Sequence, residues 1–70
     1  MRALPTLRQG ATGTDVRSVQ GLCTARGHAA AIDGIFGPAT ESAVRSVQAA
    51  AGVTVDGIVG PVTWQKLMAV

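Results

Sequence analysis

Aromatic side chains are scarce in this chain of 70 residues, which has one Phe, one Trp and no Tyr. A hydrophobic core must therefore be built from aliphatic residues around Phe36 and Trp64. The chain also has a single cysteine, Cys23, which excludes an internal disulfide and a cysteine-based metal site. With His28 as its one histidine, it lacks the grouped ligands that are typical of zinc centres. We expect neither a cofactor nor a metal.

The sequence has no long hydrophobic run and no cluster of like charges. No apolar stretch approaches the roughly 20 residues that a membrane span needs, and the opening residues 1–5 are too short for a signal peptide. The net charge of +2 comes from scattered residues, so nothing predicts a surface that follows the phosphates of a nucleic acid. We therefore expect neither a membrane nor a nucleic acid as a partner. If the protein works outside the cytoplasm, its export route is not encoded in this chain.

What the chain does contain is a duplicated turn. The stretch Asp33–Thr40 (DGIFGPAT) returns as Asp56–Thr63 (DGIVGPVT), with six of eight positions identical. Asp-Gly is a turn dipeptide, because Asp accepts backbone hydrogen bonds and Gly adopts positive φ without strain. Gly-Pro indicates a helix start, with Pro at the first helical position. We call the two stretches the first corner and the second corner, and each is expected to deliver the chain into a helix.

Apolar spacing predicts three helices, over about residues 14–26, 38–51 and 61–68. Residues 1–6 are interpreted as a flexible leader or a linker remnant, and residues 7–70 as one domain. The fold class that follows is all-α. It is a compact three-helix bundle with two pseudo-symmetric Asp-Gly loop-helix corners.

Two details of these helices are also predicted. Thr12 or Thr14 is expected to cap the first helix, since a hydroxyl oxygen accepts a hydrogen bond from an N–H of the first turn. In the third helix, Trp64, Leu67 and Met68 are expected to face the core together.

These features resemble a known family, the type 1 peptidoglycan-binding domain, a small three-helix module of bacterial and phage wall hydrolases. The resemblance covers about Leu7–Leu67 and includes both corners, each of which ends in Pro-x-Thr and leads into a helix. The sequence departs from the family pattern at Val47, where an aromatic is usual, at His28, where Tyr is common, and at Cys23, where Leu is more usual.

The resemblance implies a non-catalytic module that anchors a wall hydrolase or a phage lysin, outside the cell or in the cell wall. Stem peptides of peptidoglycan carry carboxylates, D-alanine methyls and amide edges, which suit a shallow apolar groove with exposed N–H groups. We expect such a groove between the first corner, the helix of residues 38–51 and the second corner, in a monomer. Its candidate ligand-binding residues are Gly34, Phe36, Gly37, Arg45, Gln48, Asp56, Gly57, Gly60 and Trp64. The alternative function is a protein–protein docking module on the same fold, with no affinity for the wall.

Several of these residues also have a purely structural interpretation. Phe36 and Trp64 suit the core, and Arg45 suits an ordinary solvated helix face. Gln48 and its counterpart Gln20, which are matched across the repeat, suit braces that satisfy loop carbonyls.

No catalytic residue is predicted. Cys23 falls on the apolar stripe of its helix, where a free thiol behaves as a small hydrophobe. His28 follows the helix end, where it can approach the last carbonyls. Asp33 and Asp56 are best explained as turn residues that accept backbone N–H bonds, which keeps them ionised rather than sharing a proton.

Overall fold

Glycine precedes each of the three helices, as the sequence pattern predicts. The computed structural model describes residues 4–69, and its helices are α1 (Thr14–Ala25), α2 (Pro38–Ala51) and α3 (Pro61–Met68). Both α2 and α3 begin with Pro, and α2 ends at Gly52, whose φ of 72° lies in the left-handed region that glycine favours. The all-α class is confirmed, and the predicted helix ranges agree with these bounds to within one residue.

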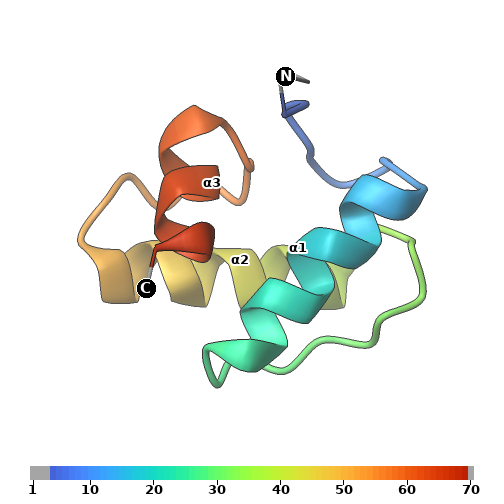
Figure 1. Ribbon diagram of the computed structural model, residues 1–70, viewed down its shortest axis with the longest axis horizontal. Coiled ribbons are helices and arrows are strands. Elements are labelled where there is room, and N and C mark those ends of the chain that lie inside the picture. The colour runs from blue at the N-terminus through green and yellow to red at the C-terminus, as the bar shows by residue number, and fades with distance from the viewer. Residues whose placement is uncertain (1–3, 70) are drawn as a thin grey trace.

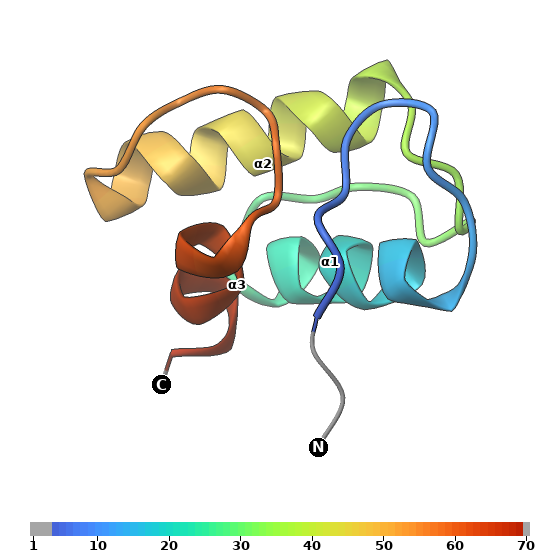
Figure 2. The same ribbon diagram turned by 90° about the horizontal axis from the view of Figure 1, so that it is seen from above.

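The longest helix, α2, provides the surface on which the other two pack. Each helix contacts both of the others, and α1 and α3 lie side by side against α2 (Figure 1, Figure 2). The bundle is compact, with a radius of gyration of 10.5 Å. No strand forms within residues 4–69; the β-like pairing there consists of two isolated antiparallel bridges, Leu7 with Val59 and Thr12 with Ile35.

Residues 7–13, which we call the N-terminal segment, connect the two corners. Leu7 and Val59 exchange backbone hydrogen bonds of 3.0 and 2.8 Å. At the first corner, Gly10 N–H donates to Phe36 O, and Phe36 N–H donates to Ala11 O, both at 2.9 Å. Figure 2 shows this segment in blue, running between the orange second corner and α1.

The hydrophobic core lies where the helices and both corners meet. Phe36 and Trp64 are 1% and 3% exposed, so the two aromatic rings are core residues. The other buried apolar residues are Leu7, Val16, Val19, Cys23, Ala43, Val44, Val47, Val59 and Leu67. The indole Nε1–H of Trp64 donates to Pro5 O at 2.7 Å, so the end of the predicted leader contacts α3. Residues 1–3 of that leader lie outside the described residues.

Two predicted details are wrong. Met68 is 50% exposed, because it is the last residue of α3 and the chain leaves the helix at Ala69. The N-cap of α1 is Gly13, and no side chain bonds to that helix end within the described part of the chain. Thr12 instead pairs with Ile35, and Thr14 is already helical, so neither takes the N-cap position.

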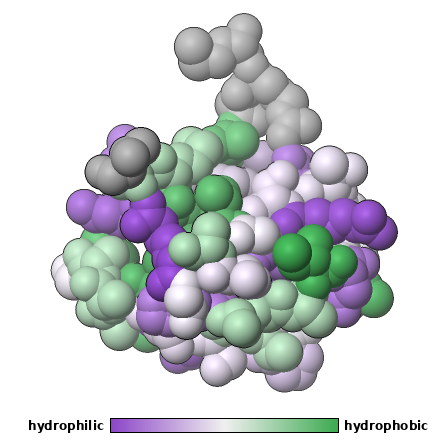
Figure 3. Space-filling view, turned by 60° about the horizontal axis from the view of Figure 1, so that its bottom comes forward, coloured by the Kyte–Doolittle hydropathy of each residue, from purple (hydrophilic) through white to green (hydrophobic). Residues whose placement is uncertain are grey.

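The surface mixes hydrophobic and hydrophilic side chains on the face drawn in Figure 3. None of the helices within residues 4–69 has the length and apolar character that crossing a membrane requires.

Candidate functional site

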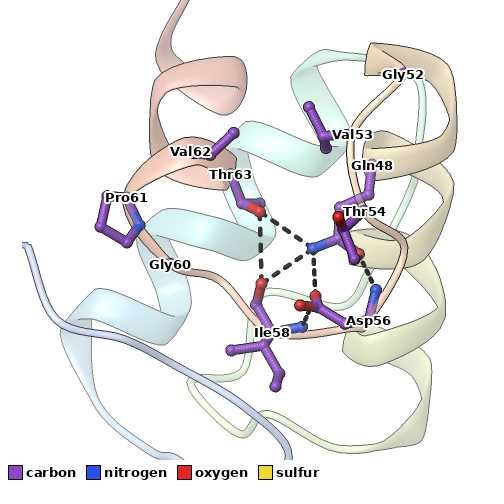
Figure 4. Close-up of a pocket in the computed structure, with 10 residues that line it drawn as sticks. All are labelled: Gln48, Gly52, Val53, Thr54, Asp56, Ile58, Gly60, Pro61, Val62 and Thr63. Carbon is purple, nitrogen blue, oxygen red and sulfur yellow. Dashed lines mark hydrogen bonds between the residues drawn. The ribbon is translucent and has the colours of Figure 1, made fainter.

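The second corner is held by one buried side chain, Gln48 of α2. Its Nε2 donates to Asp56 Oδ1, Ile58 O and Thr63 Oγ1 at 2.9, 3.0 and 3.1 Å. Its Oε1 accepts from the backbone N–H groups of Asp56 and Gly57 at 3.1 and 3.0 Å. Figure 4 shows this amide at the centre of the turn. Because every polar atom of the amide is used inside the protein, Gln48 supports the site from within. This confirms its interpretation as a structural brace.

The first corner is held in the same way by Gln20 of α1. Its Nε2 donates to Asp33 Oδ1, Ile35 O and Thr40 Oγ1 at 2.9, 3.0 and 2.9 Å. Its Oε1 accepts from Gly34 N–H at 3.0 Å. The sequence echo between the helices therefore has a physical cause: each Gln fixes the turn that precedes the next helix.

The aspartates of the corners are turn residues, as expected. Asp33 Oδ1 accepts from Ile35 N–H, and Asp56 Oδ1 accepts from Ile58 N–H, each at 2.9 Å. These backbone bonds, followed by the bond from the Gln amide, lower the pKa of both aspartates below the ordinary value. Both carboxyls are therefore ionised at neutral pH.

The glycine after Asp56 is required by close packing as well as by its backbone. Gly57 has a φ of 73°, and a Cβ there would lie 2.8 Å from Glu41 Cγ. Arg45 lies over the same glycine and pairs with Glu41 at 3.3 Å, with its side chain 50% exposed. Gly57 is consequently buried beneath this ion pair. It meets neighbouring groups of the protein rather than open solvent.

A pocket of about 490 Å³ opens beside the second corner, and we call it the second-corner pocket. Its lining comes from the C-terminal end of α2, the following loop and the start of α3 (Figure 4). The lining residues are Gln48, Gly52, Val53, Thr54, Asp56, Ile58, Gly60, Pro61, Val62 and Thr63. Gly60 is the N-cap of α3, and no side chain within residues 4–69 caps that end. Pro61 has no N–H and Trp64 N–H donates to Gly60 O, so the first-turn N–H groups left for a ligand are those of Val62 and Thr63, two residues of the pocket lining.

The structure divides the predicted site residues into groups. Three of them, Gln48, Asp56 and Gly60, line the second-corner pocket, whereas Gly57 and Arg45 lie next to each other and do not line it. Three others, Gly34, Phe36 and Gly37, belong to the first corner and do not line this pocket. Trp64 lines a separate pocket of about 470 Å³ between α1 and α3, where it meets Leu4, Leu22 and Met68.

The N-terminal segment explains this division. It is hydrogen-bonded to Phe36 on one side and to Val59 on the other, so it occupies the space between the corners. The second-corner pocket is lined by residues of the second corner and by none of the first. The rings of Phe36 and Trp64 are also largely packed in the core.

Comparison with known proteins identifies the architecture. A family model described as "Putative peptidoglycan binding domain" matches residues 12–67. The chain belongs to this family. The match includes both corners and all of α1 and α2.

Relatives of this peptidoglycan-binding domain include enzymes and solved structures. The zinc D-Ala-D-Ala carboxypeptidase of Streptomyces albus G is 45% identical over 65 residues, covering 89% of this chain and 26% of the enzyme. The crystal structure of Burkholderia AP3 phage endolysin is 46% identical with a TM-score of 0.90, covering 93% of this chain and 25% of that one. The crystal structure of the SleB N-terminal domain is 35% identical with a TM-score of 0.87, covering 93% and 90%. This domain thus spans about a quarter of the first two proteins and most of the third.

Some lining residues of the second-corner pocket were missed by sequence reasoning. The loop residues Val53 and Thr54 and the helix residue Val62 were not among the predicted site residues. The available signal was the short connection between the Gln of α2 and the second corner. It brings the loop close to the start of α3, whereas the corresponding connection at the first corner is longer.

The thiol of Cys23 is poorly placed to act as a nucleophile. Cys23 is fully buried, and burial raises the pKa of its thiol to about 11. Within residues 4–69, no group of three or more His, Cys, Asp or Glu residues is placed to hold a metal ion.

Proposed function

We propose that this peptidoglycan-binding domain is a non-catalytic module that binds the peptide stem of peptidoglycan in its second-corner pocket. In this role it holds a wall hydrolase or a phage lysin on its substrate, outside the cell or in the cell wall, as a monomer. The observation that carries the proposal is the second-corner pocket, which opens between the end of α2 and the start of α3. The chain that forms it belongs to the peptidoglycan-binding family.

The lining of the pocket suits a short peptide. Val53, Ile58 and Val62 offer apolar contacts for methyl groups such as that of alanine. The uncapped first turn of α3, beginning at Gly60, offers N–H donors and the positive end of a helix dipole to a carboxylate or an amide carbonyl. The Gln48 brace holds these parts in place before any ligand arrives.

Co-sedimentation with purified sacculi tests the function. We expect the domain to move to the pellet at low and moderate salt, and to release no labelled fragments from dye-labelled walls. A domain that stays in the supernatant would contradict wall binding and would favour the docking-module alternative. Size-exclusion chromatography checks the monomer.

A pair of matched variants tests the position of the site. Val62 is 53% exposed on the pocket wall, and Val62→Glu places a carboxylate there. An acidic residue in the first helical turn is compatible with folding, yet it should repel an anionic ligand, so we expect weaker sedimentation. Ala39 holds the corresponding position at the first corner, outside the pocket. Ala39→Glu should therefore bind like the parent chain, and an equal loss in both variants would contradict a site confined to the second corner.

Titration with soluble muropeptides separates stem-peptide recognition from glycan recognition. Amide NMR shifts should gather on residues 52–63 when the stem peptide is present. The same glycan without its peptide should cause no chemical-shift changes at these residues. Shifts confined to α1 would count against the pocket.

A further inference from the structure

A smaller pocket is lined by residues near the C-terminal end of α2. Its volume is about 190 Å³, and its lining comes from all three helical units of the fold. Arg26 is the C-cap of α1, His28 follows it, and Lys66 lies in the last turn of α3. The remaining lining residues are Val47, Ala50 and Ala51 of α2. We call this the cationic pocket.

In the described part of the chain, no acid balances the charges around the cationic pocket. Its lining residues there include no carboxylate. Asp33 and Asp56 are engaged in their corner turns, and Glu41 pairs with Arg45. Asp15 lines the pocket between α1 and α3 instead. Within residues 4–69, Arg26 and Lys66 therefore line this concavity without an acidic partner.

The donors at the rim are partly fixed in position. Arg26 Nε donates to Leu67 O at 2.9 Å, which ties the guanidinium to α3 and leaves its Nη groups for another acceptor. His28 offers a ring N–H in either protonation state, and Lys66 offers an exposed ammonium. Beneath them the floor is small and apolar, because it consists of Val47, Ala50 and Ala51.

We propose that the cationic pocket binds a carboxylate that carries a small apolar substituent, as at the D-alanyl end of a stem peptide. The guanidinium and ammonium groups receive the carboxylate, and the methyl group rests on the floor of α2. This inference rests on the proposed function, which it extends. Both pockets are lined by residues from the C-terminal half of α2 and from α3.

A structural role for the same cations makes a different prediction. Arg26 and Lys66 lie near the C-terminal ends of helices, where positive charge offsets the partial negative charge of the last carbonyls. If this were their whole role, removing Lys66 would lower thermal stability slightly and leave ligand affinity unchanged. Affinity is therefore the measurement that separates the two roles.

The test uses the full chain, labelled with ¹⁵N, and N-acetyl-D-alanine as the probe. We expect chemical-shift changes at residues 26–28, 47–51 and 66. The neutral amide, N-acetyl-D-alaninamide, should cause much smaller changes. Equal shifts from the acid and the amide would overturn the carboxylate assignment. Inorganic phosphate is the third probe, and shifts as large as those from N-acetyl-D-alanine would show that the apolar floor has no part, which also overturns it.

Two variants and their controls give the strength of each contact. Lys66→Gln should weaken N-acetyl-D-alanine binding by roughly threefold to tenfold. Arg8→Gln removes the same charge at an exposed position that does not line the pocket and should have no effect. Ala50→Leu fills the floor and should abolish the shifts, whereas Ala49→Leu, on an exposed neighbour that does not line the pocket, should preserve them. Equal behaviour within either pair would refute the proposal.

Co-sedimentation with sacculi tests wall binding separately from carboxylate binding in the cationic pocket. If Lys66→Gln and Ala50→Leu sediment like the parent chain, the wall-binding function stands and the cationic pocket is excluded from it. If the parent chain does not sediment but N-acetyl-D-alanine still shifts the pocket residues, the carboxylate site stands and the wall-binding function fails.

Discussion

Replacing Gln48 with leucine removes the brace of the second corner while keeping a side chain of similar size. The amide makes five hydrogen bonds there, and those to Gly57 N–H and Thr63 Oγ1 are buried. A buried polar group left without a partner costs roughly 1–3 kcal/mol. In the variant, Thr63 Oγ1 still donates to Ile58 O at 3.4 Å. The stability lost at Thr63 is therefore smaller than the stability lost at Gly57 N–H. We expect Gln48→Leu to lower the free energy of unfolding by about 3 kcal/mol.

Such a loss is large for a domain of this size, whose total stability is roughly 3–10 kcal/mol. It corresponds to a fall in melting temperature of roughly 12–24 °C, which calorimetry or circular dichroism would record. Gln65→Leu is the matched control, because Gln65 is an exposed residue of α3. This variant should have a melting temperature close to that of the parent chain. If Gln48→Leu melts within a few degrees of Gln65→Leu, the brace does not stabilise the corner and the reasoning is refuted.

The other predictions concern the core, the glycines and the aspartates. Trp64→Ala should lower the free energy of unfolding by about 3–5 kcal/mol, because Trp64 is only 3% exposed. Urea denaturation measures this loss, and an unchanged midpoint would mean that the ring lies on the surface. Gly57→Ala should destabilise the domain by about 1–2 kcal/mol from its positive φ alone. Gly21→Ala, inside α1 with nothing within 4 Å of the new Cβ, should stabilise it by roughly 0.5–1 kcal/mol, so thermal melts of the two variants must move in opposite directions. The lowered pKa values of Asp33 and Asp56 stabilise the fold above the unfolded pKa of about 3.9. Stability should therefore be constant between neutral pH and about pH 5 and fall as the pH drops through the lower folded pKa values. Urea midpoints measured across pH should lose most of this acid dependence in the double variant Asp33→Asn, Asp56→Asn.

The helices could be predicted because their ends are marked in the sequence. Gly-Pro begins α2 and α3, and Gly52 stops α2, so local chemistry decides these bounds. The orientation of Met68 could not be read in this way. Helical spacing places it beside Trp64, but as the last residue of α3 it is 50% exposed, and no other element described within residues 4–69 covers it.

The binding surface was harder to predict than the fold. The corners, their aspartates and the two Gln braces follow from the repeat, since each acts on residues close in sequence. The surface between the corners depends instead on the N-terminal segment. This segment is held by backbone hydrogen bonds to Phe36 and Val59, and no periodic pattern in the sequence predicts them. The cationic pocket was missed for a similar reason, because Arg26, His28 and Lys66 come together only through the packing of α1 against α3.

The pairing of Leu7 with Val59 and of Pro5 with Trp64 bears on how this module can be transplanted. The family match begins at residue 12. A fusion protein that begins there would lose the backbone hydrogen bonds between Leu7 and Val59, and the indole N–H of Trp64 would lose its acceptor, Pro5 O. Chimaeras that begin near residue 4 should retain the native melting profile, whereas those that begin at residue 12 should need a substitute strand from the new host.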